Sequence, residues 1–235
     1  MIKNRIIYLF TIMTFCQANS PNFIGEVLHY SAGFRYFAAG NATLSMEADS
    51  LDNEIAYLLT YTIKTNSFLS NFYKIKDKIY SWLSPDDLSL KKTIHSIREG
   101  GYKINHEAII NGDSLTVSGK NAIKLSEKIH DPVSYVYFLR MKKLSIGDRY
   151  RFNSYGRKKI KEIIIDVTGK ENIKVPAGTF NCFKIEPVTE DGKPILKNKG
   201  EMQVWLSDDS LHLPVKIVQN TNVGMMVMNL KTISP

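Results

Sequence analysis

The residues that could act as acids, bases or metal ligands are scattered along this sequence. Its five histidines, His29, His95, His106, His130 and His212, do not stand at the spacing that metal sites use. His106 lies on the apolar side of an alternating segment, where a hydrogen-bonded core histidine is the usual occupant. We therefore predict no metal site and no cofactor, and we assign no catalytic histidine.

The adjacent carboxylates Asp208 and Asp209 and the thiol of Cys182 are the remaining candidates for chemistry. Glycosidases need two carboxyl groups at a set separation, which adjacency in sequence does not supply. We interpret Asp208 and Asp209 as a turn that hydrogen-bonds its own backbone. Cys182 has no histidine or basic helix end near it in the sequence, so we expect a buried, unreactive thiol. The sequence thus assigns no catalytic residue.

Aromatic side chains offer a different function, which is the binding of a ligand. The candidates for lining a cavity are Tyr57, Tyr61, Tyr102, Tyr137 and Phe138. Aromatic residues at strand spacing also build ordinary cores, so a ligand cavity and a solid core both remain open.

Residues 1–18 have the organisation of a secretory signal peptide. Lys3 and Arg5 precede a short apolar run, and Ala18 is a small residue at the expected cleavage site. The run is shorter than the ~20 residues that a transmembrane helix needs. We predict a signal peptide over 1–18 and a single β-rich domain over 19–235.

Export also changes how the composition is interpreted. The signal peptide carries two basic residues and no acidic ones, so its removal lowers the formal net charge from +8 to +6. Cys16 leaves with it, and Cys182 alone cannot form an internal disulfide. Phe15, rather than a small residue, precedes Cys16, so we expect a soluble periplasmic protein rather than a lipoprotein. We expect no nucleic-acid partner and no membrane span in the mature chain.

Alternation of apolar and polar residues predicts the elements that position these side chains. It is clearest over Glu54–Thr65, and it recurs over 102–110, 115–117, 163–167 and 202–206. Short turn sequences separate these segments, so neighbouring strands should be antiparallel. The hydrophobic content of 43% and charged content of 23% exclude a disordered chain.

One segment, over 131–143, breaks the alternation and predicts a helix. Asp131 and Pro132 suit a helix start, and apolar residues lie all around the helix, so we expect it to be covered on several sides. A buried Arg140 then needs an acceptor, for which we predict Asp208, Asp209 or a loop carbonyl. A shorter helical turn is predicted over 68–73.

The predicted fold is therefore mainly β, with one large curled antiparallel sheet and one covering helix near 131–143. A long sheet must curl or fold over to hide its apolar face. A half-barrel and a two-sheet sandwich both satisfy this requirement.

Three segments in order carry a resemblance to a known family. They are the residues 131–140 (DPVSYVYFLR), 175–180 (VPAGTF) and 205–209 (WLSDD) followed by 213–215 (LPV). Together they resemble bacterial exported proteins of domain of unknown function 3108, over roughly residues 24–230. The resemblance implies an envelope protein with a mainly antiparallel β domain, and it implies no catalytic residue. The curled sheet with a helix in its mouth is also similar to periplasmic lipoprotein-carrier folds, in architecture alone.

Three functions follow, in order of support. The first is non-enzymatic binding of an apolar or amphipathic ligand such as a lipid. The second is a structural or interaction module with a solid core and an envelope protein as its partner. The third is an envelope enzyme that acts on polymers. The basic segment 157–161 could contact anionic lipid or polysaccharide, or it could protect a sheet edge.

Overall fold

The computed structural model describes residues 21–34, 37–70, 74–118, 120–156, 159–192, 202–221 and 224–234. The strands are β1 (Val27–Phe34), β2 (Phe37–Leu51), β3 (Glu54–Thr65), β4 (Lys76–Leu83), β5 (Leu90–Glu99), β6 (Tyr102–Asn111), β7 (Ser114–Val117), β8 (Ile123–Lys124), β9 (Ile129–His130), β10 (Arg149–Gly156), β11 (Lys159–Val175), β12 (Gly178–Val188), β13 (Met202–Ser207), β14 (Pro214–Thr221) and β15 (Gly224–Ser234). The helices are α1 (Ser67–Ser70) and α2 (Ser134–Arg140).

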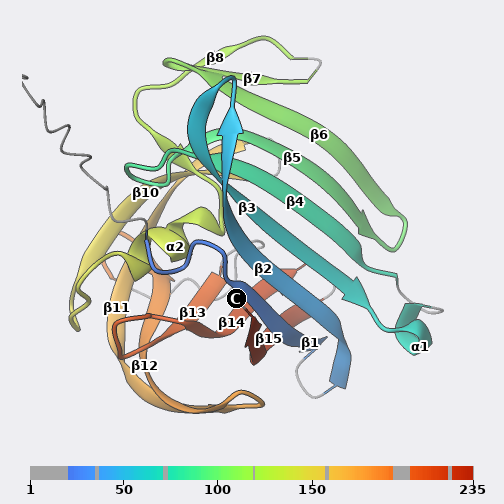
Figure 1. The fold of residues 1–235 in the computed structure, drawn as a ribbon, viewed down its shortest axis with the longest axis vertical. Helices are drawn as coiled ribbons and strands as arrows, with labels where there is room; N and C mark the ends of the chain where they lie inside the picture. Colours follow the sequence, from blue (N-terminus) through green and yellow to red (C-terminus); the bar gives the residue numbers. More distant parts are fainter. Residues whose placement is uncertain are drawn as a thin grey trace, which may run out of the picture.

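Over these residues the strands form one continuous sheet that curls around α2 (Figure 1). Its order is β8-β7-β6-β5-β4-β3-β2-β1-β15-β14-β13-β12-β11-β10-β9. The pairing of β1 with β15 at the centre joins the first and last strands of the chain. The predicted mainly β fold with one curled sheet is therefore confirmed. Between its two ends the sheet has no break that would divide it into the two sheets of a sandwich.

Strand neighbours follow chain order because most connections are tight hairpins. The turn between β2 and β3 consists of Asp52 and Asn53, whose φ angles of 54° and 65° are ones that Asp and Asn tolerate. Gly112 supplies a φ of 60° between β6 and β7. The alternation over Glu54–Thr65 predicted β3 with its observed bounds.

One strand pair departs from the predicted antiparallel arrangement. β9 pairs in parallel with β10, and the segment that connects them contains α2. A parallel pair needs a long crossover, and the helix supplies it. The sequence did not indicate this parallel pair, because β9 has only two residues.

α2 lies on the concave side of the sheet and separates two clusters of buried residues (Figure 1). Tyr135, Val136 and Leu139 belong to the larger cluster, and Tyr137 belongs to the smaller one. The helix is shorter than predicted, because it ends at Arg140 and leaves the exposed Lys142 and Lys143 beyond it. Of the helical turn predicted over 68–73, α1 covers the first residues, and 71–73 lie outside the described residues.

The curl brings the two edges of the sheet back toward each other. β8 forms one edge and β9 the other, and only residues 125–128 connect them. A chain segment of this length spans at most roughly 18 Å. Lys124, the last residue of β8, and Ile129, the first residue of β9, are therefore close in space, although they belong to opposite edges of the sheet.

Candidate ligand site

A cleft of about 650 Å³ lies between the turns at one end of strands β2 to β7 and the segment that links β8 to β9. This volume falls within the ~300–1,000 Å³ that is typical of small-molecule sites. Its walls come from the β2–β3 turn, the β4–β5 connection, the β6–β7 turn and the segment between β8 and β9. The lining residues are Leu51, Asp52, Glu54, Ser84, Ser89, Leu90, Lys91, Ile110, Asn111, Gly112, Asp113, Leu125, Ser126, Glu127, Lys128 and Ile129.

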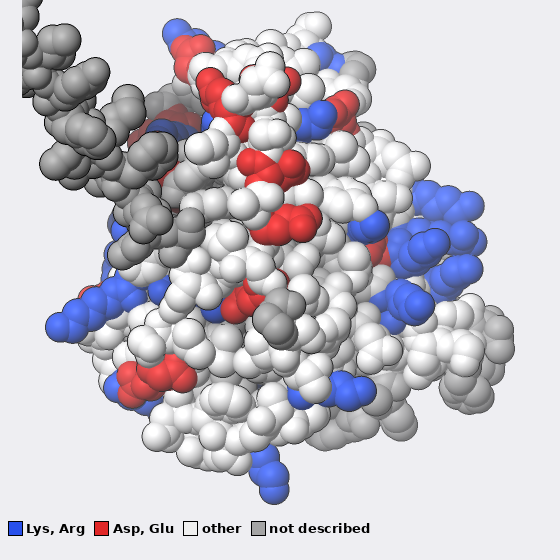
Figure 2. All heavy atoms as spheres, viewed as in Figure 1, with Lys and Arg blue, Asp and Glu red and all other residues white. Residues whose placement is uncertain are grey.

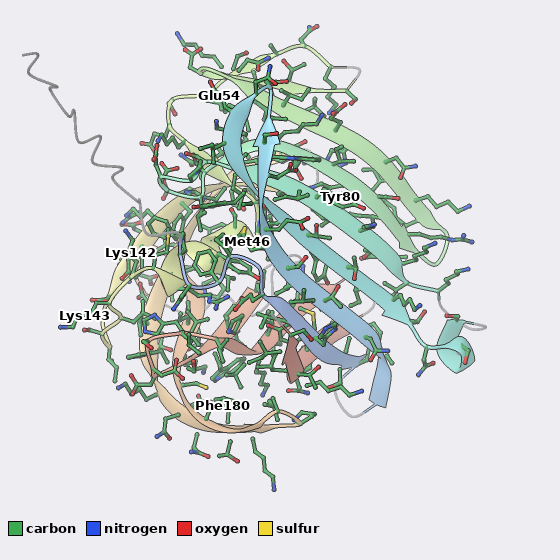
Figure 3. All side chains as sticks on the ribbon, viewed as in Figure 1. Met46, Glu54, Tyr80, Lys142, Lys143 and Phe180 are labelled. Carbon is green, nitrogen blue, oxygen red and sulfur yellow. The ribbon has the colours of Figure 1, made fainter. Side chains whose placement is uncertain are left out.

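The cleft has an aliphatic part and a charged part. Five of its lining residues are leucine or isoleucine, and Leu90 and Ile129 among them are buried. Four carboxylates and two lysines make up the charged part. Figure 3 shows one of these carboxylates, Glu54, at the tip of the β2–β3 hairpin. Such a lining suits a molecule that has both an apolar part and a polar end.

Ion pairs fix the charged side chains around the cleft. The Nζ atom of Lys91 lies 2.8 Å from Glu54, and that of Lys128 lies 2.6 Å from Asp87. The hydrogen bond and charge of Lys91 lower the pKa of Glu54. Burial raises the pKa of Asp87, but hydrogen bonds from Lys128 and Ser89 outweigh it and leave the pKa below its ordinary value. Glu54 and Asp87 are thus ionised at neutral pH, and the side chains around the cleft offer both signs of charge.

The five aromatic candidates do not line this cleft. Tyr61 is buried in the larger core cluster, and Tyr57 and Tyr137 are buried in the smaller one. Phe138 is partly buried beside the larger cluster, and Tyr102 is 47% exposed at the start of β6. The structure therefore does not bring these five residues together around one cavity.

Arg140 is buried, and its guanidinium pairs with Glu26. Nη1 contacts Oε1 of Glu26, Nη2 donates to Oε2 at 2.9 Å, and Nε donates to the carbonyl oxygen of Leu211 at 3.2 Å. The rings of Phe23 and Tyr137 lie 4.9 and 5.1 Å from the guanidinium carbon. The predicted loop carbonyl is present, whereas the carboxylate comes from the segment before β1.

Asp208 and Asp209 serve other partners than the predicted Arg140. Asp208 lies 2.5 Å from Nζ of Lys170, and Asp209 accepts hydrogen bonds from the side chain of Ser207 and the backbone of Leu211. Asp209 thereby closes the turn between β13 and β14. Its carboxylate is used by these local hydrogen bonds and not by Arg140. The sequence did not point to Glu26, because it lies outside the alternating segments.

A second buried polar group lies on the concave face. His95 and His106 stand opposite each other on β5 and β6, with ring centroids 4.4 Å apart, and Tyr155 of β10 lies against His106. Ser81 and Thr93 share a hydrogen bond of 3.0 Å nearby on the same sheet. Burial, and then the neighbouring His106, lower the pKa of His95 to about 3. The ring of His95 is therefore neutral and acts as part of the packing.

Two further predicted features concern reactivity. Cys182 is buried, and burial with nearby carboxylates raises the pKa of its thiol to about 12, so the thiol stays protonated. Within the described ranges, no three His, Cys, Asp or Glu side chains are grouped to hold a metal ion.

In the basic segment 157–161, residues 157 and 158 lie outside the described residues, and Lys161 is exposed on β11.

Sequence reasoning missed the cleft because turns and a linking segment build it. The sequence marked Asn111 and Gly112 as a turn, but nothing in their pattern showed that three other connections would meet them.

No helix among the described residues is long and apolar enough to cross a bilayer.

One solved structure with a similar fold, and one weaker match, come from other families of unknown function. A β-barrel-like protein of family DUF1849 from Brucella abortus has a TM-score of 0.57 and 10% identity, covering 90% of this chain and 98% of that one. A DUF1089 protein from Pseudomonas aeruginosa has a TM-score of 0.44 and 9% identity, covering 77% and 90%. At such identity the first match shows the fold alone, and the lower TM-score of the second carries no conclusion.

The family itself is identified by the sequence. No curated protein matches the chain. The sequence pattern of the proteins of unknown function DUF3108 matches residues 28–231, which is most of the chain and runs from β1 into β15. The chain therefore belongs to the DUF3108 family.

Proposed function

We propose that this protein is exported to the periplasm and binds an amphipathic ligand, such as a lipid, without catalysing a reaction. The observation that carries the proposal is the cleft between the β2–β3, β4–β5 and β6–β7 connections and the segment 125–129, with aliphatic and charged walls and a volume of about 650 Å³. Export rests on the signal-peptide pattern of residues 1–18. Residues 19–235 then form the single domain of the mature protein.

We propose that the ligand binds in the cleft and not between α2 and the sheet. The space around α2 is occupied by the side chains of the two core clusters, including Tyr61 and Tyr137. This packing agrees with the solid core of the structural-module hypothesis. The cleft at the sheet edges is what favours ligand binding over that hypothesis.

The charges in the cleft suggest which polar end the ligand carries. Its lining has four carboxylates but two lysines, and Lys91 and Lys128 already pair with Glu54 and Asp87. An anionic group would meet this excess of negative charge, whereas a zwitterionic or cationic group would find carboxylates close by. We infer a ligand with one short apolar part and a zwitterionic or cationic polar end.

The test is extraction of the protein, purified from the envelope of an expressing bacterium, with organic solvent. Mass spectrometry of the extract should show a stoichiometric amphipathic compound. Ser126→Trp, at an exposed position of the cleft wall, should remove that compound by filling the space. Thr116→Trp on β7, which is exposed and outside the cleft, is the matched control and should retain it.

Two results would contradict the proposal. An extract without any bound compound would leave the structural module as the better account. A compound that both tryptophan variants retain would show that the ligand binds elsewhere.

A further inference from the structure

The outer face of the sheet carries an unbalanced group of basic side chains at the end that lies opposite the cleft. These residues, called the basic end below, come from β3 to β6 and from the short segment before β4. All are exposed, and they are Lys64, Lys74, Lys76, Lys78, Arg98 and Lys103. Figure 2 shows blue side chains gathered on the right, over the end of the sheet where the β5–β6 hairpin lies in Figure 1.

The strand register places these cations side by side. Lys64 stands directly opposite Lys76, and Arg98 stands directly opposite Lys103. The backbone N–H of Gly100 donates to the carbonyl of Lys74, which holds Lys74 beside the β5–β6 turn. Like charges at directly opposite positions destabilise a sheet. Stability of the fold therefore does not account for this arrangement.

The same outer face is charge-balanced toward its other end. Lys92 pairs with Glu107 at 2.6 Å, and the indole N–H of Trp82 donates to Asp49. By contrast, none of the six residues of the basic end forms an ion pair with a described residue. The neutral Asn41 stands opposite Lys64, and the neutral Thr62 and Ser96 stand opposite Lys78. The register neighbours of the basic end on this face thus include no carboxylate.

A tyrosine accompanies these charges on the same face. Nζ of Lys78 lies 4.6 Å from the ring centroid of Tyr80. Figure 3 shows Tyr80 on β4 in the middle of this arm of the sheet. Tyrosine combines an apolar ring with a polar hydroxyl, and it is enriched at membrane–water interfaces.

We propose that the basic end docks the protein on the surface of a membrane that contains anionic phospholipid. Clustered lysines attract such a surface without specific geometry, and five of the six cations are lysines. Recognition of a folded acidic partner more often uses arginine, whose planar group binds carboxylates in a defined geometry. The docking surface is separate from the cleft and does not depend on the function proposed for it.

Vesicle flotation tests this proposal with the exported, purified protein. Vesicles of phosphatidylcholine that contain phosphatidylglycerol should carry the protein, pure phosphatidylcholine vesicles should not, and added salt should weaken the binding. Each lysine near such a surface contributes roughly fivefold to partitioning. The triple variant Lys76→Gln, Lys78→Gln and Lys103→Gln should therefore lose on the order of 100-fold.

The matched control removes the same charge from other exposed positions, with Lys143→Gln, Lys174→Gln and Lys231→Gln. It should lose severalfold less than the triple variant of the basic end. Equal losses in the two triples would overturn the proposal, because net charge alone would then explain binding. Equal binding to both kinds of vesicle would overturn it as well. Binding to polyglutamate without binding to vesicles would also overturn it and assign the face to an acidic protein.

Discussion

The pair formed by Arg140 and Glu26 illustrates how a single buried charge organises its surroundings. The side chain of Arg140 is fully buried, and that of Glu26 is 12% exposed. A guanidinium in this position requires both its carboxylate and its two flanking rings. Through this contact the segment before β1 holds the end of α2 against the sheet.

Removal of one partner should be costly. We expect Arg140→Met to lower the free energy of unfolding by about 3–5 kcal/mol, because Glu26 would keep a poorly solvated charge. The double variant Glu26→Leu, Arg140→Met should recover part of this loss. Urea denaturation measures both, with Arg149→Met on the exposed pair with Asp166 as the control. If Arg140→Met costs no more than this control, Arg140 does not hold the helix.

The histidine pair on the concave face should make stability depend on pH. His95 has a pKa of about 3 in the folded protein, because of burial, against an ordinary value of 6.5. The unfolded chain thus binds more protons between these values, so stability is lost as the pH falls below about 6.5. Asp77 acts in the opposite direction, since burial raises its pKa to about 6 and favours the folded state at acidic pH.

A variant isolates the contribution of His95. We expect the difference in unfolding free energy between the wild type and His95→Phe to fall by about 2 kcal/mol from about pH 6.5 to about pH 5. Urea titrations at several pH values give this difference, in which the effect of Asp77 cancels. A difference that stays constant over this range would show that His95 is protonated as easily in the folded state.

At the scale of elements, the close approach of β2 and β3 depends on Gly40. A Cβ atom at this position would lie 2.0 Å from the carbonyl oxygen of Lys64 on the neighbouring strand. Backbone atoms cannot yield as a flexible side chain does. The bulge in the pairing of β1 with β2 lies next to this glycine and bends the strand there.

Gly40→Ala should therefore destabilise the sheet by about 1–3 kcal/mol, as overpacking does in a tight interior. Gly169→Ala on β11 is the matched control, because a Cβ there meets no atom within 4 Å. Thermal unfolding of the two variants provides the measurement. Equal melting temperatures would show that β2 and β3 can separate at this point without loss.

The elements differ in how far the sequence predicted them. β3 was predicted with its observed bounds, because one face is buried and the other is wet along its length. The interior helix was predicted from its break in alternation, but its end was not, since the exposed Lys142 and Lys143 belong to the following turn. β9 was not predicted, because two residues carry no alternation.

At the scale of the whole molecule, the curl of the sheet creates the cleft, which no local sequence pattern predicts. The cleft depends on turns that are separated by up to 78 positions, from Leu51 to Ile129, and only the complete sheet brings them together. The sequence therefore predicted a curled sheet with a covering helix, whereas three of the five aromatic residues that it offered as cavity candidates are buried in the core clusters. The pairing register of strands far apart in the sequence determines which turns meet at such a site, and a single sequence does not show this register.

Photolabelling tests the central claim, that an amphipathic ligand binds in the cleft beside the segment 125–129, most directly. The envelope-purified protein would be irradiated with a zwitterionic lysophospholipid whose single short acyl chain carries a diazirine, and the labelled residues would be mapped by mass spectrometry. Saturable labelling within 51–54, 84–91, 110–113 and 125–129, absent in Ser126→Trp and retained in Thr116→Trp, is the predicted result. Labelling that lies on the outer face of the sheet, or that does not saturate, would contradict the account.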